Sequence, residues 1–462
     1  MERTTAKKNK YEIDMCNGTI MDKLISFSLP LMLSGILQLM FNAVDIIVVG
    51  RFSGSQALAA VGSTSALINV FTNLFIGISL GANVLTARFY AAGREKEVSE
   101  TVHTAVTLAL VSGIIMALVG LVFSKGALAL MGTPDDVIGL SALYMRIYFL
   151  GMPFFMLYNY GAAILRAVGD TKRPLLFLMI AGVINACLNM VLVIVFKLGV
   201  AGVAIATVIS QMISCVLVLR CLCRSESSYR LRFSELGMKG YYLKQIFSVG
   251  VPAGIQSTVI NFSNVLLQSS VNSFGSTAMA GYTAANNLLG FLYVSVNSIT
   301  QACMSFTSQN YGVRKLKRMD RVLADCMILS VVVAVVLGCI CYGFGPEILQ
   351  IYTEDAEVIA CGMEILAYTT ITYFLCGWMD LFPGALRGMG YSAVPMVLSV
   401  IGTVGTRVVW IFGIFPYHRS LAILFISYPA SWIITIILQV VCFYFVRRRV
   451  HRRSQTLAGQ EG

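Results

Sequence analysis

Charged residues are scarce in this sequence. Only 12% of the 462 residues are Asp, Glu, Lys or Arg, whereas 57% are hydrophobic. An average soluble domain is roughly one quarter charged. Once the apolar segments are set aside, no stretch is left that is long enough for a soluble domain of useful size. This composition predicts a chain that faces lipid over most of its length.

Residues that usually carry catalysis or bind metals are scarce as well. The three histidines, His103, His418 and His451, have no partners at a spacing typical of metal or acid–base sites. None of the twelve cysteines forms a CxxC pair, as many zinc sites would require. The sequence also lacks a GxxxxGK[ST] phosphate-binding loop. We therefore expect neither an enzyme nor an ATP-driven pump, and we expect no cofactor.

Long apolar runs dominate the sequence instead. A helix of about 20 apolar residues crosses the hydrocarbon layer of a bilayer. The runs predict an all-α membrane protein with twelve transmembrane helices. We place these helices near 23–50, 57–90, 101–123, 138–168, 174–197, 200–222, 243–272, 278–311, 321–344, 357–389, 394–414 and 421–446.

The net charge of +12 is unevenly distributed. Lysines and arginines gather in both tails and in alternate connections, for example Lys172 and Arg173 between the fourth and fifth spans. The opposite connections carry few bases. By the positive-inside rule, this pattern predicts that both termini are cytoplasmic in a protein of the cell membrane. The charge thus indicates topology, and we expect the bilayer rather than a nucleic acid as partner.

The second half of the chain repeats the first. Residues 165–174 return as residues 386–395, an offset of 221, and the motif that ends at Pro30 is echoed by one that ends at Pro252. Each half carries six predicted spans, so both halves insert in the same orientation. This predicts two six-helix bundles related by a pseudo-two-fold axis along the membrane normal. The expected parts are a tail 1–22, an N-lobe 23–222, a linker 223–242, a C-lobe 243–446 and a tail 447–462.

Asp45 is a charged residue inside the first predicted span, where a charge costs at least about 2.5 kcal/mol. In the fifth span, Asn185 and Asn189 are four residues apart and share one helix face. Counting 1.5 Å per residue from the ends of the two spans places Asn189 at the depth of Asp45. The three side chains are candidates for Na⁺ binding or for a network around a protonatable acid. The alternatives are local bonding of Asp45 near the interface and hydrogen bonds that only hold helices together.

Two more intramembrane charges, Asp380 in the tenth span and Arg407 in the eleventh, lie on consecutive helices. We expect them to pair, since each would otherwise be an uncompensated buried charge. A structural pair and a proton-responsive pair both stay open. Pro30 and Pro252 fall at matching places in spans one and seven and predict helix kinks, either static or moving with the state of the site.

These features together resemble the bacterial type of the multidrug and toxic compound extrusion (MATE) family over about residues 20–450. The resemblance rests on twelve spans, two parallel halves, Pro30 and Asp45 in the first span and the repeated Leu-Arg-x-x-Gly turn. By position, Asp45 matches the family's first-span aspartate, Pro30 its bending proline, and Asn185 and Asn189 its two polar fifth-span positions. Relatives often carry an aspartate in place of Asn189, so the coupling ion stays open between H⁺ and Na⁺.

The resemblance implies an antiporter, coupled to H⁺ or Na⁺, that exports organic cations or other amphipathic drugs by alternating access between two lobes. We expect a monomer. The alternative is a flippase for lipid-linked saccharide precursors, which belongs to the same superfamily. Flippases of this kind tend to need several cavity bases, whereas Arg407 is the only clear intramembrane base in the sequence.

Overall fold

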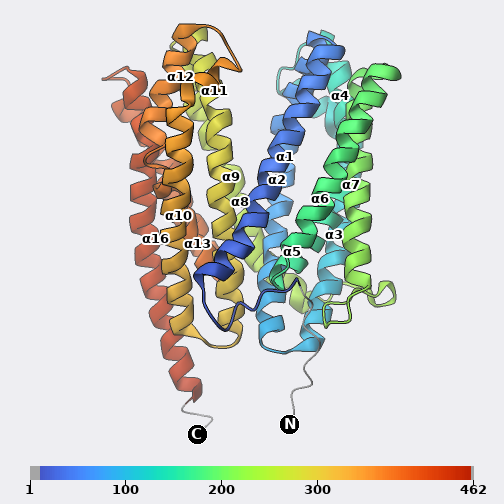
Figure 1. The fold of residues 1–462 in the computed structure, drawn as a ribbon, viewed down its shortest axis with the longest axis vertical. Coiled ribbons are helices and arrows are strands. Elements are labelled where there is room, and N and C mark those ends of the chain that lie inside the picture. The colour runs from blue at the N-terminus through green and yellow to red at the C-terminus, as the bar shows by residue number, and fades with distance from the viewer. Residues whose placement is uncertain (1–10, 459–462) are drawn as a thin grey trace. The chain divides into compact units, whose positions relative to one another are not determined.

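The computed structural model describes residues 11–458, and every regular element in that range is a helix (Figure 1). This confirms the predicted all-α class. The first half contains α1 (Met21–Phe52), α2 (Ser55–Ala91), α3 (Glu95–Leu130), α4 (Asp135–Leu150), α5 (Met152–Ala167), α6 (Lys172–Asn189), η1 (Met190–Val195) and α7 (Gly199–Cys223). The linker carries η2 (Phe233–Glu235). The second half contains α8 (Gly240–Asn272), α9 (Ser276–Gly312), α10 (Leu316–Gly343), α11 (Gly345–Gln350), α12 (Ala356–Thr369), α13 (Tyr373–Gly388), α14 (Ala393–Ser399), η3 (Val400–Gly405), α15 (Thr406–Val409), η4 (Trp410–Ile414) and α16 (Leu421–Ala458).

Among the described residues, eight helices are long and apolar enough to cross a membrane, and two bent pairs raise the number to ten. The pairs are α4–α5, bent by 47°, and α12–α13, bent by 51°. They occupy the fourth and tenth predicted spans. Two further long helices, α8 and α9, fall on the seventh and eighth predicted spans, but polar side chains such as Gln256 and Gln301 interrupt their apolar runs. The twelve predicted positions are therefore all helical.

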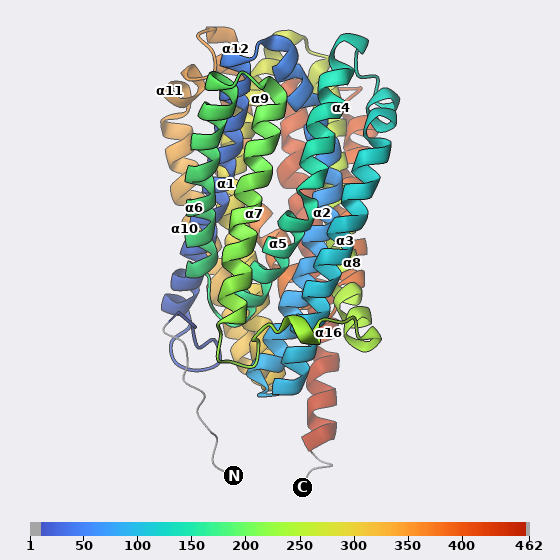
Figure 2. The same ribbon diagram turned by 90° about the vertical axis from the view of Figure 1, so that its right-hand side faces the viewer.

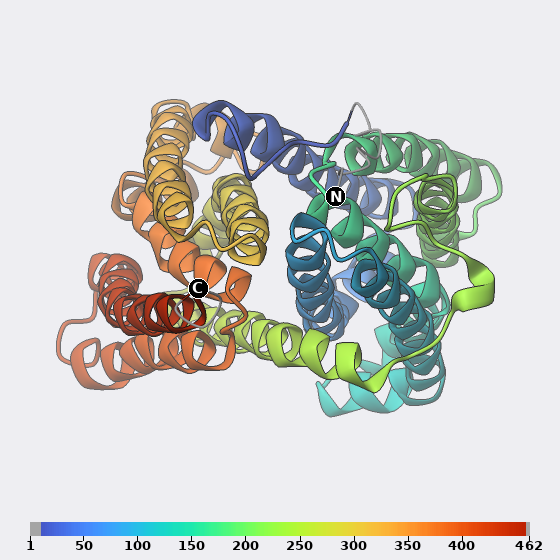
Figure 3. The same ribbon diagram turned by 90° about the horizontal axis from the view of Figure 1, so that it is seen from below.

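The chain folds into two compact units, each a helix bundle when seen end-on (Figure 3). The first unit comprises Leu33–Val251 and the residues just before Asp14, and the second comprises Asp14–Met32 and the chain from Pro252 onward. The boundaries therefore differ from the expected lobe limits at 23 and 243. The start of α1 belongs to the second unit and the start of α8 to the first. The point where α1 passes from one unit to the other lies within three residues of Pro30, and the corresponding point in α8 lies next to Pro252.

Close backbone contact explains why the start of α8 packs in the first unit. A Cβ atom on Gly81 of α2 would lie 2.2 Å from the carbonyl oxygen of Ile246, and one on Gly250 of α8 would lie 2.5 Å from the Cα of Ile78. Small residues allow membrane helices to approach this closely. The two glycines therefore dock α8 on α2.

The start of α1 is held in the second unit by ring packing and by basic residues. Phe27 packs edge-to-face on Phe306 of α9, with ring centroids 5.6 Å apart. Just before α1, the carbonyl oxygen of Met15 accepts hydrogen bonds from Arg318 at 3.2 Å and from Asn310 at 3.1 Å. These contacts account for the place of residues 14–32 in the second unit.

In the first unit, α6 and α7 run side by side (Figure 2). Asp170 lies in the loop just before α6, the first of these two helices. Its fully buried carboxylate accepts the backbone N–H of Arg173 at 3.1 Å and forms an ion pair with the Arg173 guanidinium. Burial raises the pKa of the Asp170 carboxyl, while Arg173 opposes this shift. The pair therefore anchors the first turn of α6.

Substitution Asp170→Asn should destabilise the protein far more than Asp320→Asn. Removing one partner of a buried ion pair costs about 3 kcal/mol or more, because the other charge stays buried. The ion pair of Asp320 with Arg447 is partly exposed, and such pairs contribute about 0–1 kcal/mol. Thermal unfolding of the two purified variants measures the difference. Equal melting temperatures would show that the Asp170 pair does not anchor α6.

Candidate functional site

Asp45 and three other polar side chains, contributed by three helices of the first unit in all, form one hydrogen-bonded group. Asp45 of α1 is only 8% exposed. Its Oδ1 accepts a hydrogen bond from Nδ2 of Asn189 on α6, and its Oδ2 accepts one from the hydroxyl of Thr207 on α7 at 3.4 Å. The same Nδ2 donates to Oδ1 of Asn185 at 3.1 Å. We call these four residues the Asp45 cluster.

The Asp45 cluster carries more acceptors than donors. Oδ1 of Asn189 is buried and has no hydrogen-bond partner within residues 11–458, which is costly for a buried carbonyl oxygen. Among the described residues, no Lys, Arg or His pairs with Asp45. A carboxylate surrounded by amide and hydroxyl oxygens suits a hard cation such as Na⁺. The same carboxylate can take up a proton, so both ions predicted from the sequence fit.

The packing of α1 on α6 positions the Asp45 cluster. Phe41 lies one turn before Asp45, and its ring fills the space beside Gly182, where a Cβ atom would come within 1.8 Å of it. This contact fixes the position of α1 along the axis of α6. Immediately after Asn189, the helix widens into the π-helical segment η1. Such widened turns often occur at functional sites.

Two tyrosines of α4 lie within range of the Asp45 charge. Tyr144 and Tyr148 stack with ring centroids 6.1 Å apart, and both interact electrostatically with Asp45. Aromatic faces attract organic cations. The first unit therefore places a carboxylate and aromatic rings in one neighbourhood.

The expected ion pair of Asp380 with Arg407 is absent from the part of the chain that the structure describes. Arg407 is 3% exposed and donates Nη1 to Oδ1 of Asn264 at 2.7 Å and to the hydroxyl of Ser263 at 3.3 Å, both on α8. Its guanidinium also lies 4.7 Å from the ring centre of Tyr428. The pairing prediction was wrong because α14 to η4 turns Arg407 toward α8 rather than toward α13.

Asp380 instead interacts with a base of its own helix. Arg387, two turns later on α13, is the basic side chain that acts on its charge. Arg387 in turn donates a hydrogen bond to Gln256 of α8 at 2.6 Å. Asp380 and Arg407 therefore belong to separate polar groups of the second unit.

The two prolines singled out in the sequence lie inside continuous helices, Pro30 in α1 and Pro252 in α8. Each stands next to a boundary between the compact units. A proline inside a helix removes one backbone hydrogen bond and lowers the resistance to bending. Whether either helix bends during function remains a prediction.

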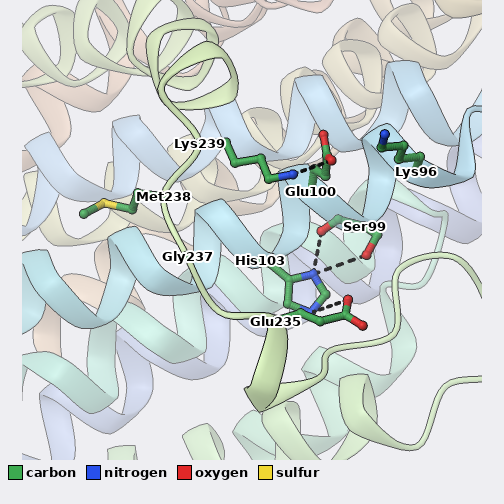
Figure 4. Close-up of a pocket in the computed structure, with 8 residues that line it drawn as sticks. All are labelled: Lys96, Ser99, Glu100, His103, Glu235, Gly237, Met238 and Lys239. Atoms are coloured by element: carbon green, nitrogen blue, oxygen red, sulfur yellow. Dashed lines mark hydrogen bonds and ion pairs between the residues drawn. The ribbon is translucent and has the colours of Figure 1, made fainter.

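A pocket of about 400 Å³ lies between α3 and the linker (Figure 4). Nε2 of His103 accepts the backbone N–H of Arg232 at 3.0 Å, so Nδ1 carries the proton and donates it to the Ser99 carbonyl at 2.7 Å. Glu235 lies 3.8 Å from Nε2. His103, which has no partner pattern in the sequence, thus fastens the linker to α3. The remaining lining residues are Lys96, Glu100, Gly237, Met238 and Lys239.

Comparisons with known proteins agree with this architecture. The MatE family profile matches residues 30–191 and again residues 252–412, once in each half. The chain is 32% identical over 434 residues to the probable multidrug resistance protein YoeA of Bacillus subtilis (strain 168), covering 92% of this chain and 93% of YoeA. It is 22% identical to the multidrug export protein MepA of Staphylococcus aureus (strain NCTC 8325 / PS 47), covering 82% of this chain and 84% of MepA.

Solved structures show the same fold. A crystal structure of MATE in complex with MaL6 matches with a TM-score of 0.88 at 20% identity, covering 97% of this chain and all of that one. The double profile match, the YoeA identity and this fold agree with the twelve-helix, two-bundle plan. The chain belongs to the MatE family of multidrug efflux transporters and is a membrane transport protein rather than an enzyme.

Proposed function

We propose that this protein is an antiporter that exports organic cations and related amphipathic drugs in exchange for H⁺ or Na⁺ bound at the Asp45 cluster. The observation that carries the proposal is a buried carboxylate that has no basic partner among the described residues, beside an Oδ1 of Asn189 that is unpaired within the same part of the chain. The names of YoeA and MepA support drugs as the substrate class. The basic tails support a cell-membrane protein with both ends in the cytoplasm.

Charge balance explains why export needs a coupling ion. Moving a monovalent cation out of an inside-negative cell costs about 2.3 kcal/mol per 100 mV. Inward movement of one H⁺ or Na⁺ offsets this electrical cost. The chemical gradient of the coupling ion is then left to drive the drug outward.

Competition between the drug and the coupling ion for the negative charge of Asp45 couples drug export to ion entry. An ionised Asp45 attracts an organic cation, whose apolar body packs against aromatic rings such as Tyr144 and Tyr148. A proton or Na⁺ that reaches Asp45 from outside neutralises it and weakens that attraction. The bonds from Asn189 and Thr207 then rearrange, α1 bends at Pro30, and the drug leaves outward. Alternating access follows from this exchange.

Purified protein in liposomes tests the function. A fluorescent organic cation such as ethidium is enclosed with the protein, and either a pH gradient or a Na⁺ gradient is imposed. We expect one of the two gradients to drive ethidium movement against its own gradient. Failure of both gradients, with protein that is folded and inserted, would overturn the proposal.

Thr207→Val should slow ion-driven efflux about two- to five-fold without abolishing it. The hydrogen bond to Asp45 is long, and a bond of this kind is worth about 0.5–1 kcal/mol. Thr72→Val on α2 is the matched control, because the bonds that the hydroxyl of Thr72 makes to described residues all go to carbonyl groups of its own helix. The ethidium assay compares the two variants. Equal rates for both would remove Thr207 from the site.

A further inference from the structure

Arg407 is a buried charge that the proposed exchange cycle does not use. It lies on α15, a four-residue α-helical segment between the π-helical segments η3 and η4. Two widened segments in one span are costly features that occur frequently at functional sites. The place of Arg407 therefore calls for an explanation beyond helix packing.

The partners of Arg407 are all neutral. Asn264 and Ser263 accept hydrogen bonds from Nη1, and the ring of Tyr428 lies against the guanidinium. Nε is buried and has no hydrogen-bond partner in the described part of the chain. Among the residues that the structure describes, no carboxylate pairs with Arg407. An uncompensated charge inside the membrane is strongly unfavourable unless a counter-ion joins it.

The two halves place these polar groups at related positions. In the first unit, Asn189 of α6 contacts Asp45 of α1. In the second unit, Arg407 contacts Asn264 of α8. Subtracting the 221-residue repeat offset from 407 and 264 gives 186 and 43, each within three residues of the first-unit pair. The contact between α1 and α6 in the first unit thus corresponds to the contact between α8 and α15 in the second. The first contact contains an acid and the second contains a base.

We propose that the second unit binds a small monovalent anion at Arg407, as the counterpart of the cation site in the first unit. The ligand is either an inorganic halide or the carboxylate of an organic substrate. The free Nε–H of Arg407 is one donor. Asn264 turns its Oδ1 toward the guanidinium, which leaves its Nδ2 as a second donor. N–H donors beside a fixed positive charge are the groups that recognise such anions.

Thermal unfolding of the purified full-length protein tests this site. Sodium sulfate is exchanged for sodium chloride or for sodium benzoate at constant sodium concentration. All three tryptophans, Trp378, Trp410 and Trp432, belong to the second unit. Trp432 lies with its ring 5.9 Å from that of Tyr428, so tryptophan fluorescence reports on the surroundings of Arg407. We expect a saturable rise of several degrees in melting temperature and a saturable fluorescence change.

Two substitutions assign this response to the site. Arg407→Gln removes the charge, and Asn264→Asp supplies a carboxylate that occupies the guanidinium in place of the anion. Both should lose the saturable response, and Asn264→Asp should melt in sulfate at or above the wild-type temperature. Arg419→Gln, at an exposed arginine of the same unit, is the control and should respond as the wild type does.

The outcomes separate the two sources of the anion. A response to chloride identifies the ligand as an inorganic ion. A response to benzoate alone identifies it as the carboxylate of an organic substrate. No saturable response in the wild type, or an unchanged response in Arg407→Gln, overturns the proposal. If Arg407→Gln does not fold, Asn264→Asp decides, because an unchanged response in that variant would also overturn it.

Discussion

Asp45→Asn should lower ion-driven efflux of an organic cation by about tenfold or more, which corresponds to about 1.4 kcal/mol or more of lost coupling. Asparagine keeps the size of the side chain, and its Oδ1 can accept the bond from Asn189 while its Nδ2 faces the hydroxyl of Thr207 as a donor. It cannot, however, change charge. In the proposed cycle the drug and the coupling ion share the charge of Asp45, so we expect that the gradient cannot drive export once this charge is removed. Ethidium movement in liposomes under the driving gradient measures the loss.

The matched control is Asp136→Asn, at an exposed acid in the first turn of α4. It should leave the rate of efflux within about twofold of the wild type, since exposed charges are largely screened. Both variants should melt near the wild-type temperature, which separates loss of coupling from loss of fold. Undiminished gradient-driven efflux by Asp45→Asn would remove Asp45 from the mechanism.

Gly81→Val should prevent stable folding or lower the free energy of unfolding by about 3 kcal/mol, the upper end of overpacking costs. A side chain at Gly81 meets the backbone of α8, which cannot rotate away as a side chain could. The two helices must then separate, and the start of α8 loses its place in the first unit. The yield of monodisperse protein and its melting temperature measure the effect. Gly250→Val should act in the same direction because it meets the backbone of α2.

Gly126→Val on α3 is the control for this prediction. No atom lies within 4 Å of a Cβ at Gly126, so the new side chain meets open space. This variant should purify and melt like the wild type. If Gly81→Val and Gly126→Val behaved alike, close contact between α2 and α8 would not hold the first unit together.

Helix geometry alone was enough to place Asp45, Asn185 and Asn189 together. Their common depth follows from counting residues along two spans, and the four-residue spacing gives the shared face. Thr207 was missed because a hydroxyl inside a membrane helix usually bonds a carbonyl of its own helix. Thr207 does so with Val203 in addition to its bond to Asp45. The sequence carries no signal that separates it from the other hydroxyl residues of the spans.

The wrong pairing of Asp380 with Arg407 has a different cause. Because the two helices are consecutive in the sequence, they were expected to pack against each other. Which side chains meet at such a contact depends on how each helix is rotated about its own axis. The π-helical segments η3 and η4 change that rotation on both sides of Arg407. Such widened turns depend on tertiary packing, so the sequence pattern did not indicate them. Arg407 therefore bonds Asn264, whereas the charge of Asp380 interacts at longer range with that of Arg387.

The division into units was also beyond the sequence. Pro30 and Pro252 were recognised as matching positions in the two halves, but not as neighbours of the unit boundaries. The exchange of helix ends depends on close contacts between residues far apart in the chain, such as Gly81 with Ile246 and Phe27 with Phe306. Apolar periodicity gives the existence of a helix and says nothing about which bundle its first turns join.

In the proposed cycle, an organic cation and the coupling ion compete for the carboxylate of Asp45. Release of the ion when the drug binds tests it most directly. An organic cation is added to purified protein in weakly buffered solution, and a pH indicator and a sodium indicator are followed in parallel. The account predicts release of about one H⁺ or Na⁺ per bound drug by the wild type, since such linkage is reciprocal, and none by Asp45→Asn. Drug binding without release by the wild type, or equal release by Asp45→Asn, would contradict it.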